Sequence, residues 1–113
     1  MTRVLQNVRL TPMNADRLPT LSAKERIVLE LLLDGARYGL QLVAESRGAL
    51  KRGTVYVTLG RMEEKGYVTS RAEPASPAQG GLPRRLYRST PYGRELLAML
   101  TSARRRLSLR FAR

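Results

Sequence analysis

The spacing of apolar residues changes at Gly66, and this change limits the possible fold more than any other feature of the chain. Before Gly66, Val55, Leu59 and Met62 are four and three residues apart, as on one face of a helix over about 53–65. After it, residues 67–71 and 84–88 have the composition of strands, and the Pro- and Gly-rich segment 74–83 lies between them. The sequence therefore predicts a helix followed by a β-hairpin.

Two further helices are predicted before residue 53. Ser22 and Glu25 have the spacing of a capping box at the start of the first one, and Gly35 is a suitable terminator. The second covers about 39–46, and residues 47–50 break it. The residues expected to face inward are Ile27, Val28, Leu31 and Leu32 in the first helix, and Leu40 and Val43 in the second, with Leu42 as a further candidate.

The chain is strongly basic and lacks the usual catalytic residue types. It has 21 Lys and Arg residues against 9 Asp and Glu residues, for a net charge of +12. Such an excess favours a polyanionic partner, usually nucleic acid; codon bias toward Arg is a partial alternative. Because His and Cys are absent, we expect no enzyme activity, no metal site and no cofactor. With neither a signal peptide nor a membrane span in sight, we expect a cytoplasmic, nucleoid-associated protein without a membrane partner.

Thr90 and Pro91 indicate the start of a last helix that continues to about Phe111. At a length of about 30 Å, this helix extends past what a small core can cover. We expect a second copy of the chain to bury its distal part; packing against the chain's own N-terminal residues is the alternative. Apolar residues recur along the helix as in a coiled-coil seam, and the predicted dimer-interface residues are Leu96, Leu100, Ala103, Leu107 and Phe111.

These elements define a fold class and three segments. The fold class is α+β and mostly α: a winged helix-turn-helix with a C-terminal dimerisation helix. Residues 1–20 are expected to form an N-terminal arm, residues 21–90 the DNA-binding domain, and residues 91–113 the dimerisation helix.

A series of short motifs runs in order along about residues 24–100. They are Tyr38-Gly39-Leu40-Gln41-Leu42, then Gly53-Thr54-Val55-Tyr56 with Leu59, Arg61-Met62-Glu63, Gly66-Tyr67-Val68-Thr69-Ser70, and the run Gly81–Arg94. In this series the chain resembles the PadR family of transcriptional regulators. The resemblance implies a cytoplasmic, homodimeric repressor of near-palindromic promoter DNA. It is also compatible with a small-molecule effector, although the few aromatic residues and the absence of Trp predict a poor platform for one.

Two positions depart from the family pattern. Val57 stands where the family often has Pro, and Gly60 lies inside the predicted recognition helix. A glycine at such a position costs about 1 kcal/mol relative to alanine. Both departures concern how bases are contacted more than the fold.

Residues 53–65 are the predicted recognition helix, whose outward side chains near the N-terminus would enter a DNA groove. Thr54, Val57 and Thr58 are predicted to contact bases. Phosphate contacts are assigned to the basic residues around this helix and in the wing, and to a tyrosine hydroxyl: Lys51, Arg52, Tyr56, Arg61, Arg84 and Arg85. The alternative is a merely solvated polar face and, for Tyr56, a purely structural ring.

The leading hypothesis is a dimeric, sequence-specific DNA-binding repressor. One alternative is a basic nucleic-acid-binding protein without sequence preference, either an architectural DNA binder or an RNA binder. Another is a winged-helix module that binds an acidic protein. The first predicts no preferred site in a random-pool selection, and the second predicts a protein partner that survives nuclease treatment.

Overall fold

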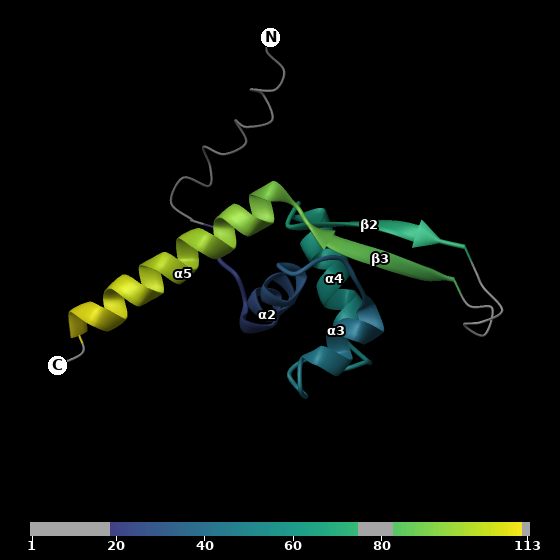
Figure 1. Ribbon diagram of the computed structural model, residues 1–113, viewed down its shortest axis with the longest axis horizontal. Coiled ribbons are helices and arrows are strands. Elements are labelled where there is room, and N and C mark those ends of the chain that lie inside the picture. Colours follow the sequence, from purple (N-terminus) through teal and green to yellow (C-terminus); the bar gives the residue numbers. More distant parts are fainter. Residues whose placement is uncertain (1–18, 75–82, 112–113) are drawn as a thin grey trace, which may run out of the picture.

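The computed structural model describes residues 19–74 and 83–111, and Figure 1 shows how they are arranged. Helices combine with one small sheet, as the predicted fold class requires. The predicted N-terminal arm lies outside the described residues except for Pro19 and Thr20, and so does the hairpin loop 75–82. In chain order the elements are α2 (Ala23–Leu32), β1 (Arg37–Tyr38), α3 (Gly39–Glu45), α4 (Val55–Glu64), β2 (Val68–Glu73), β3 (Arg84–Ser89) and α5 (Pro91–Phe111).

Helix α2 begins with the predicted capping box. The backbone N–H of Glu25 donates to Oγ of Ser22 at 3.1 Å, and the N–H of Ser22 donates to the Glu25 carboxylate at 2.9 Å. The inward face is rotated from the predicted one. Val28, Leu29 and Leu32 are buried, whereas Ile27 and Leu31 are only partly buried, so the prediction missed Leu29.

Helix α3 turns a different face inward from the one predicted. Leu42 is fully buried, Val43 is partly buried, and Leu40 is 48% exposed. The prediction for Leu40 was wrong because α3 starts directly after β1, which places Leu40 in the first turn, away from the core. The break after α3 is confirmed: Arg47 and Gly48 both adopt positive φ angles, and Leu50 then returns to the core.

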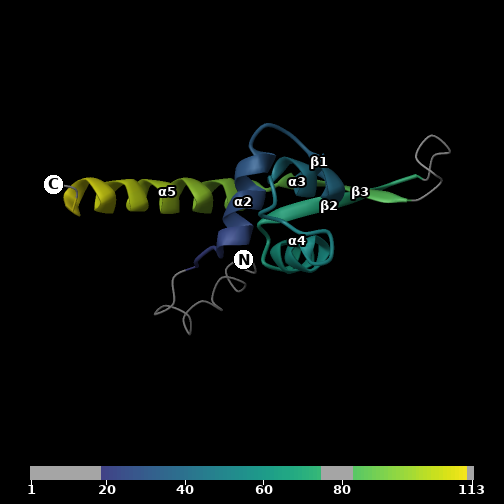
Figure 2. The same cartoon turned by 90° about the horizontal axis from the view of Figure 1, so that it is seen from below.

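The sheet has the strand order β1-β3-β2, and all neighbours are antiparallel. Strands β2 and β3 form the predicted hairpin, from the pair Val68↔Ser89 to the pair Glu73↔Arg84. Strand β1 was not predicted, because a two-residue strand has no periodicity of its own and exists only through pairing with β3. The hairpin extends to one side of the domain and α5 to the other (Figure 2).

The core lies where α2, α3, α4 and the start of α5 meet the sheet. Val55, Leu59 and Met62 of α4 are all buried, as their spacing predicted. Aliphatic side chains fill most of the core, with Tyr67 and Tyr87 at its sheet side. Burial of these three residues fixes which face of α4 is left outside.

Helix α5 is capped as predicted. Oγ1 of Thr90 accepts from the N–H of Gly93 at 3.0 Å and donates to the carbonyl of Gly66 at 2.6 Å. Gly93 lies against the backbone of Tyr67, and a Cβ atom there would overlap the Tyr67 carbonyl. Beyond Leu100 the helix leaves the domain (Figure 1). Within residues 19–74 and 83–111, no helix combines the length and apolar character needed to cross a membrane.

Candidate nucleic-acid interface

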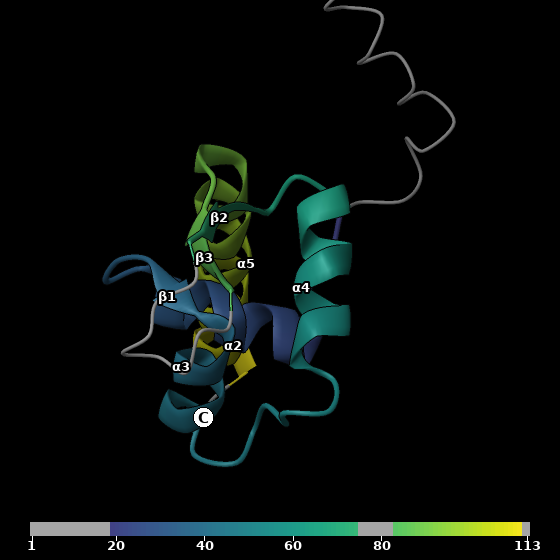
Figure 3. The same cartoon turned by 90° about the vertical axis from the view of Figure 1, so that its right-hand side faces the viewer.

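Helix α4 presents its polar face outward. Figure 3 shows this helix at one side of the molecule, with its outer side facing away from α3 and α5. Thr54 and Arg61 are exposed, Val57 is 54% exposed, and Thr58 is half-buried. Thr54 precedes the first turn but makes no capping hydrogen bond with its side chain. The three residues predicted to contact bases thus lie together on one accessible surface.

These residues also border a groove between α4 and the start of α2. The groove has a volume of about 330 Å³ and is lined by Ser22, Lys24, Glu25, Thr54, Val57, Thr58 and Arg61. Glu25 brings a carboxylate to it, but this carboxylate is bound by Nζ of Lys65 at 2.7 Å and by the Ser22 backbone. The negative charge of the groove is therefore balanced within the protein.

Lys51 and Arg52 lie in the turn before α4, and both are exposed. The carbonyl of Lys51 accepts hydrogen bonds from the N–H groups of Thr54 and Val55, at 3.1 and 2.9 Å. These bonds connect the turn to the start of α4. Lys51 and Arg52 therefore belong to the turn that leads directly into α4.

Tyr56, in the first turn of α4, lies beside the start of α3 and the hairpin. Its side chain packs over Gly39, where a Cβ atom would come within 2.5–2.7 Å of two ring carbons and the hydroxyl oxygen. The side chain is nevertheless 50% exposed. The ring therefore contacts the domain and is also partly exposed. This position is compatible with both predictions for Tyr56, a hydroxyl that contacts a phosphate and a purely structural ring.

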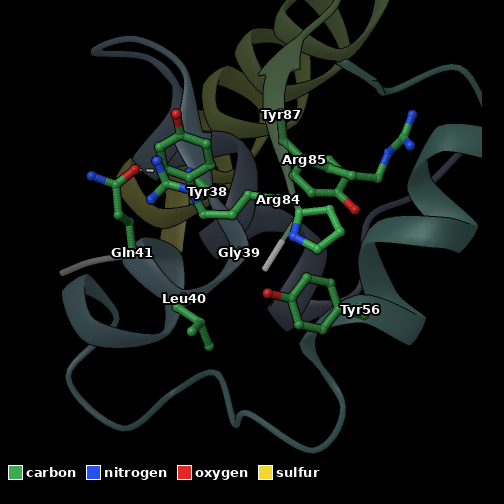
Figure 4. A pocket seen from close by; sticks show the side chains of 9 residues that line it. Tyr38, Gly39, Leu40, Gln41, Tyr56, Arg84, Arg85 and Tyr87 are labelled. Carbon is green, nitrogen blue, oxygen red and sulfur yellow. Dashed lines mark hydrogen bonds between the residues drawn. The ribbon is translucent and has the colours of Figure 1, made fainter. Parts of the chain in front are cut away.

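Tyr56 borders a pocket between the helix-turn-helix and the hairpin. Its volume is about 710 Å³, and its lining comes from the start of α3, from α4 and from β3, mainly its first residues (Figure 4). Three of the chain's five tyrosines contribute to this lining, which the sequence did not predict. The lining residues are Tyr38, Gly39, Leu40, Gln41, Tyr56, Pro83, Arg84, Arg85 and Tyr87.

Arg84 and Arg85 both lie at this pocket but have different partners within the protein. Cζ of Arg84 is 3.6 Å from the ring centroid of Tyr38, a cation–π contact. Nε of Arg85 donates to Oγ of Ser70 at 3.0 Å, and that hydroxyl donates to the Glu63 carboxylate at 2.9 Å. The sequence placed both arginines on the wing but gave no sign of these contacts.

The hydroxyl of Tyr38 donates to the Glu73 carboxylate at 2.8 Å. The other carboxylate oxygen accepts from Arg71 at 3.3 Å. The hydrogen bond from Tyr38 lowers the pKa of Glu73, and the same bond raises the pKa of Tyr38. Nothing in the sequence pointed to this connection, because Tyr38 and Glu73 are 35 residues apart and only the sheet brings them together.

The predicted dimer residues of α5 fall into two groups. Leu96 is 3% exposed and packs in the core of its own chain, which leaves little of it for a second copy. Leu100 and Ala103 are partly buried, and Leu107 is 54% exposed. Phe111 ends the helix, and its side chain lies outside the description. Met99, which was not predicted, is 59% exposed.

Comparison with known proteins places this architecture in a family. The sequence profile of the "Transcriptional regulator PadR-like family" matches residues 28–99. A PadR family transcription regulator from Clostridium difficile R20291 is 25% identical with a TM-score of 0.63, over 77% of this chain and 95% of that chain. A PadR family transcriptional regulator from Eggerthella lenta DSM 2243 is also 25% identical with a TM-score of 0.63, over 92% of this chain and 80% of that chain.

A PadR-like transcription factor from Bacteroides fragilis shares the fold at 19% identity, with a TM-score of 0.66, over 94% of this chain and 93% of that chain. The comparison with curated proteins found no match. The family match extends from α2 into α5 and includes the exposed face of α4 and the hairpin. This chain has a winged-helix fold and belongs to the PadR-like family of transcriptional regulators.

Proposed function

We propose that this protein is a dimeric, sequence-specific DNA-binding regulator that acts as a repressor. The observation that carries the proposal is the division of α4 into two faces. Val55, Leu59 and Met62 are buried, while Thr54 and Val57 are exposed on the opposite side. A helix held in this way can enter the major groove with its outer side chains against base edges. Thr54, Val57 and Thr58 are the proposed base-contacting residues.

The basic residues around α4 are the proposed phosphate contacts. Lys51 and Arg52 precede the helix, Arg61 is in its last turn, and Arg84 and Arg85 lie across the pocket from Tyr56. Such contacts set the position of a protein on a duplex and carry little sequence information. Their number and the net charge of +12 support strong salt dependence.

The second copy is proposed to pair along α5. Leu100, Ala103 and Leu107 lie on one side of this helix, and the described residues leave Leu107 54% exposed. A twofold axis would then present two α4 helices to major grooves about 34 Å apart on a near-palindromic site. Repression fits a protein of this size, because a bound dimer blocks a promoter without contacting polymerase. It would act in the cytoplasm, on nucleoid DNA.

Selection of bound duplexes from a random pool tests the proposal. We expect one near-palindromic motif to be enriched, and we expect its affinity to fall steeply with salt. In mobility-shift titrations, Thr58→Ala should change the preferred sequence, whereas Arg85→Ala should weaken specific and random duplexes by a similar factor. Equal losses on both duplexes for Thr58→Ala would exclude its role in contacting bases.

The same selection separates the alternatives. An architectural or RNA-binding protein would enrich no DNA motif. A winged-helix module for an acidic protein would show no salt-dependent duplex binding, and its partner would be retained after nuclease treatment. Either result would exclude the proposed function.

A further inference from the structure

Arg84 differs from an ordinary surface arginine because its charged end has a fixed neighbour. Its guanidinium lies over the ring of Tyr38, with Cζ 3.6 Å from the ring centroid (Figure 4). A long side chain loses rotamer freedom when it binds a ligand, and one that is already packed against a ring has less to lose. Because the guanidinium contacts the face of the ring, this contact occupies none of its N–H donors with a hydrogen-bond acceptor.

Tyr38 is itself held at three points. Its backbone pairs with Leu86 in the sheet, its N–H donates to the Gln41 side chain at 2.8 Å, and its hydroxyl donates to Glu73 at 2.8 Å. The side chain therefore crosses from the start of α3 to the end of β2. This connection places the ring between the helix-turn-helix and the hairpin.

Glu73 completes the arrangement from the neighbouring strand. It pairs directly with Arg84 in the β2–β3 register, and its second oxygen binds Arg71. In the sequence 67–90 it is the only acidic residue among several arginines. A carboxylate on a surface that meets phosphate groups is unfavourable by charge alone, so its presence needs another explanation, and the bond to the Tyr38 hydroxyl supplies one.

We propose that Tyr38 and Glu73 are positioning residues that hold the guanidinium of Arg84 at the pocket wall for a DNA phosphate. This inference rests on the proposed function, since it requires that Arg84 contact DNA. Tyr38 supplies the surface on which the guanidinium lies, and Glu73 fixes the orientation of Tyr38. Arg85, on the other face of β3, is held separately through Ser70 and does not depend on Tyr38.

A double-mutant cycle on duplex affinity tests the inference, with the duplex obtained from the selection above. We expect Arg84→Ala to weaken binding about tenfold and Tyr38→Leu about threefold. The double variant should bind no more weakly than Arg84→Ala alone, because Tyr38 acts through Arg84. Tyr38→Phe keeps the ring but removes the hydroxyl that Glu73 holds, so its affinity should lie between those of Tyr38→Leu and the wild type.

Arg85 provides the matched control. It lies on the same strand and at the same pocket, so the losses from Tyr38→Leu and Arg85→Ala should multiply. If Tyr38→Leu acted through a general loss of structure, its loss of affinity would multiply with that of Arg84→Ala as well as with that of Arg85→Ala. Multiplied losses for Tyr38→Leu with Arg84→Ala, or full affinity of Arg84→Ala, would overturn the inference, whereas a wild-type protein that binds no DNA would overturn the proposed function.

Glu73→Ala gives a second test that does not depend on the Tyr38 variants. It removes a negative charge next to the DNA surface, so a purely electrostatic role predicts tighter binding. The positioning role predicts weaker binding, because the hydroxyl of Tyr38 loses its acceptor. Unchanged or tighter binding by a folded Glu73→Ala protein, checked by thermal unfolding, would exclude Glu73 from the proposed unit.

Discussion

Nζ of Lys65, at the end of α4, lies 2.7 Å from Oε2 of Glu25, in the first turn of α2. This ion pair joins the end of the proposed recognition helix to the helix that packs beneath it. The Glu25 side chain is nearly buried, whereas that of Lys65 is 46% exposed. The pair therefore has water on one side only, which limits the screening of its charges.

The pair makes stability depend on pH. Burial raises the pKa of Glu25, but hydrogen bonds from Lys65 and Ser22 lower it by more, so the net pKa is below its ordinary value of 4.5. A lowered pKa means that the contribution of Glu25 is fully present above pH 4.5 and is lost as the pH falls through the folded-state value. The bond to Glu25 raises the pKa of Lys65, so its contribution is lost only at high pH.

Glu25→Gln isolates this charge, because a glutamine keeps the acceptor of the capping box. We expect the free energy of unfolding at pH 7 to fall by roughly 0.5–1 kcal/mol, a range reduced for the exposure of Lys65. Urea unfolding at pH 7 and pH 3 measures the effect, and the difference from wild type should shrink at pH 3. Glu30→Gln, which removes an exposed pair with Arg26, is the control and should change stability less.

Gly93→Ala should destabilise the protein, against the usual helical preference for alanine. A Cβ atom at this position meets the carbonyl of Tyr67, and a backbone atom cannot move aside cheaply. We expect a loss of about 1–3 kcal/mol in the free energy of unfolding. Gly60→Ala in α4 is the matched control: nothing lies within 4 Å of the added atom, so it should stabilise by up to about 1 kcal/mol. Equal effects of the two substitutions would contradict this packing.

Gly39→Ala should weaken DNA binding more than it changes stability. The added Cβ atom displaces the ring of Tyr56, which is half exposed and free to rotate outward. We expect a severalfold loss of duplex affinity, comparable to one hydrogen bond to a phosphate. Fluorescence anisotropy measures it. In a Tyr56→Ala background the same substitution should have no further effect, and a further loss there would show that Gly39 acts in another way.

Leu107→Asp should separate a dimer into folded monomers. Leu107 is 54% exposed and borders a shallow groove with Ala103, Arg106 and Arg110, so its replacement leaves the core intact. A buried leucine contributes about 1.5–3 kcal/mol, so the dimer dissociation constant should rise at least tenfold. Sedimentation equilibrium measures this constant. Ser102→Asp, on the opposite side of α5, should leave it unchanged, and a dimer that survives Leu107→Asp would refute this interface.

Local patterns predicted the elements that depend on local interactions. The spacing of Val55, Leu59 and Met62 identified the buried face of α4, and Ser22 with Glu25 identified the start of α2. Contacts between distant segments were not predictable in this way. The sheet brings Tyr38 to Glu73, and strand β1 exists only through β3, so neither leaves a periodic signal in the sequence.

The candidate site was predictable in its residue types more than in its arrangement. Charge and position indicated Arg84 and Arg85, and both lie at the pocket beside Tyr56. Their partners differ because alternate residues of β3 point to opposite faces of the sheet, one toward Tyr38 and the other toward Ser70. The predicted dimer interface on α5 began one turn too early, because Leu96 already contributes to the core of its own chain.

The side chain of Thr90 has a consequence for operator geometry. Its oxygen caps α5 and also contacts the carbonyl groups of Gly66 and Tyr67, which directly follow α4. Together with the backbone N–H of Thr90, which also donates to the Tyr67 carbonyl, this hydroxyl couples the directions of α4 and α5. In a twofold pair joined along α5, the angle at which the two α5 helices cross sets the distance between the two α4 helices. The number of base pairs between half-sites would then be encoded in the C-terminal helix, far from any residue that touches DNA.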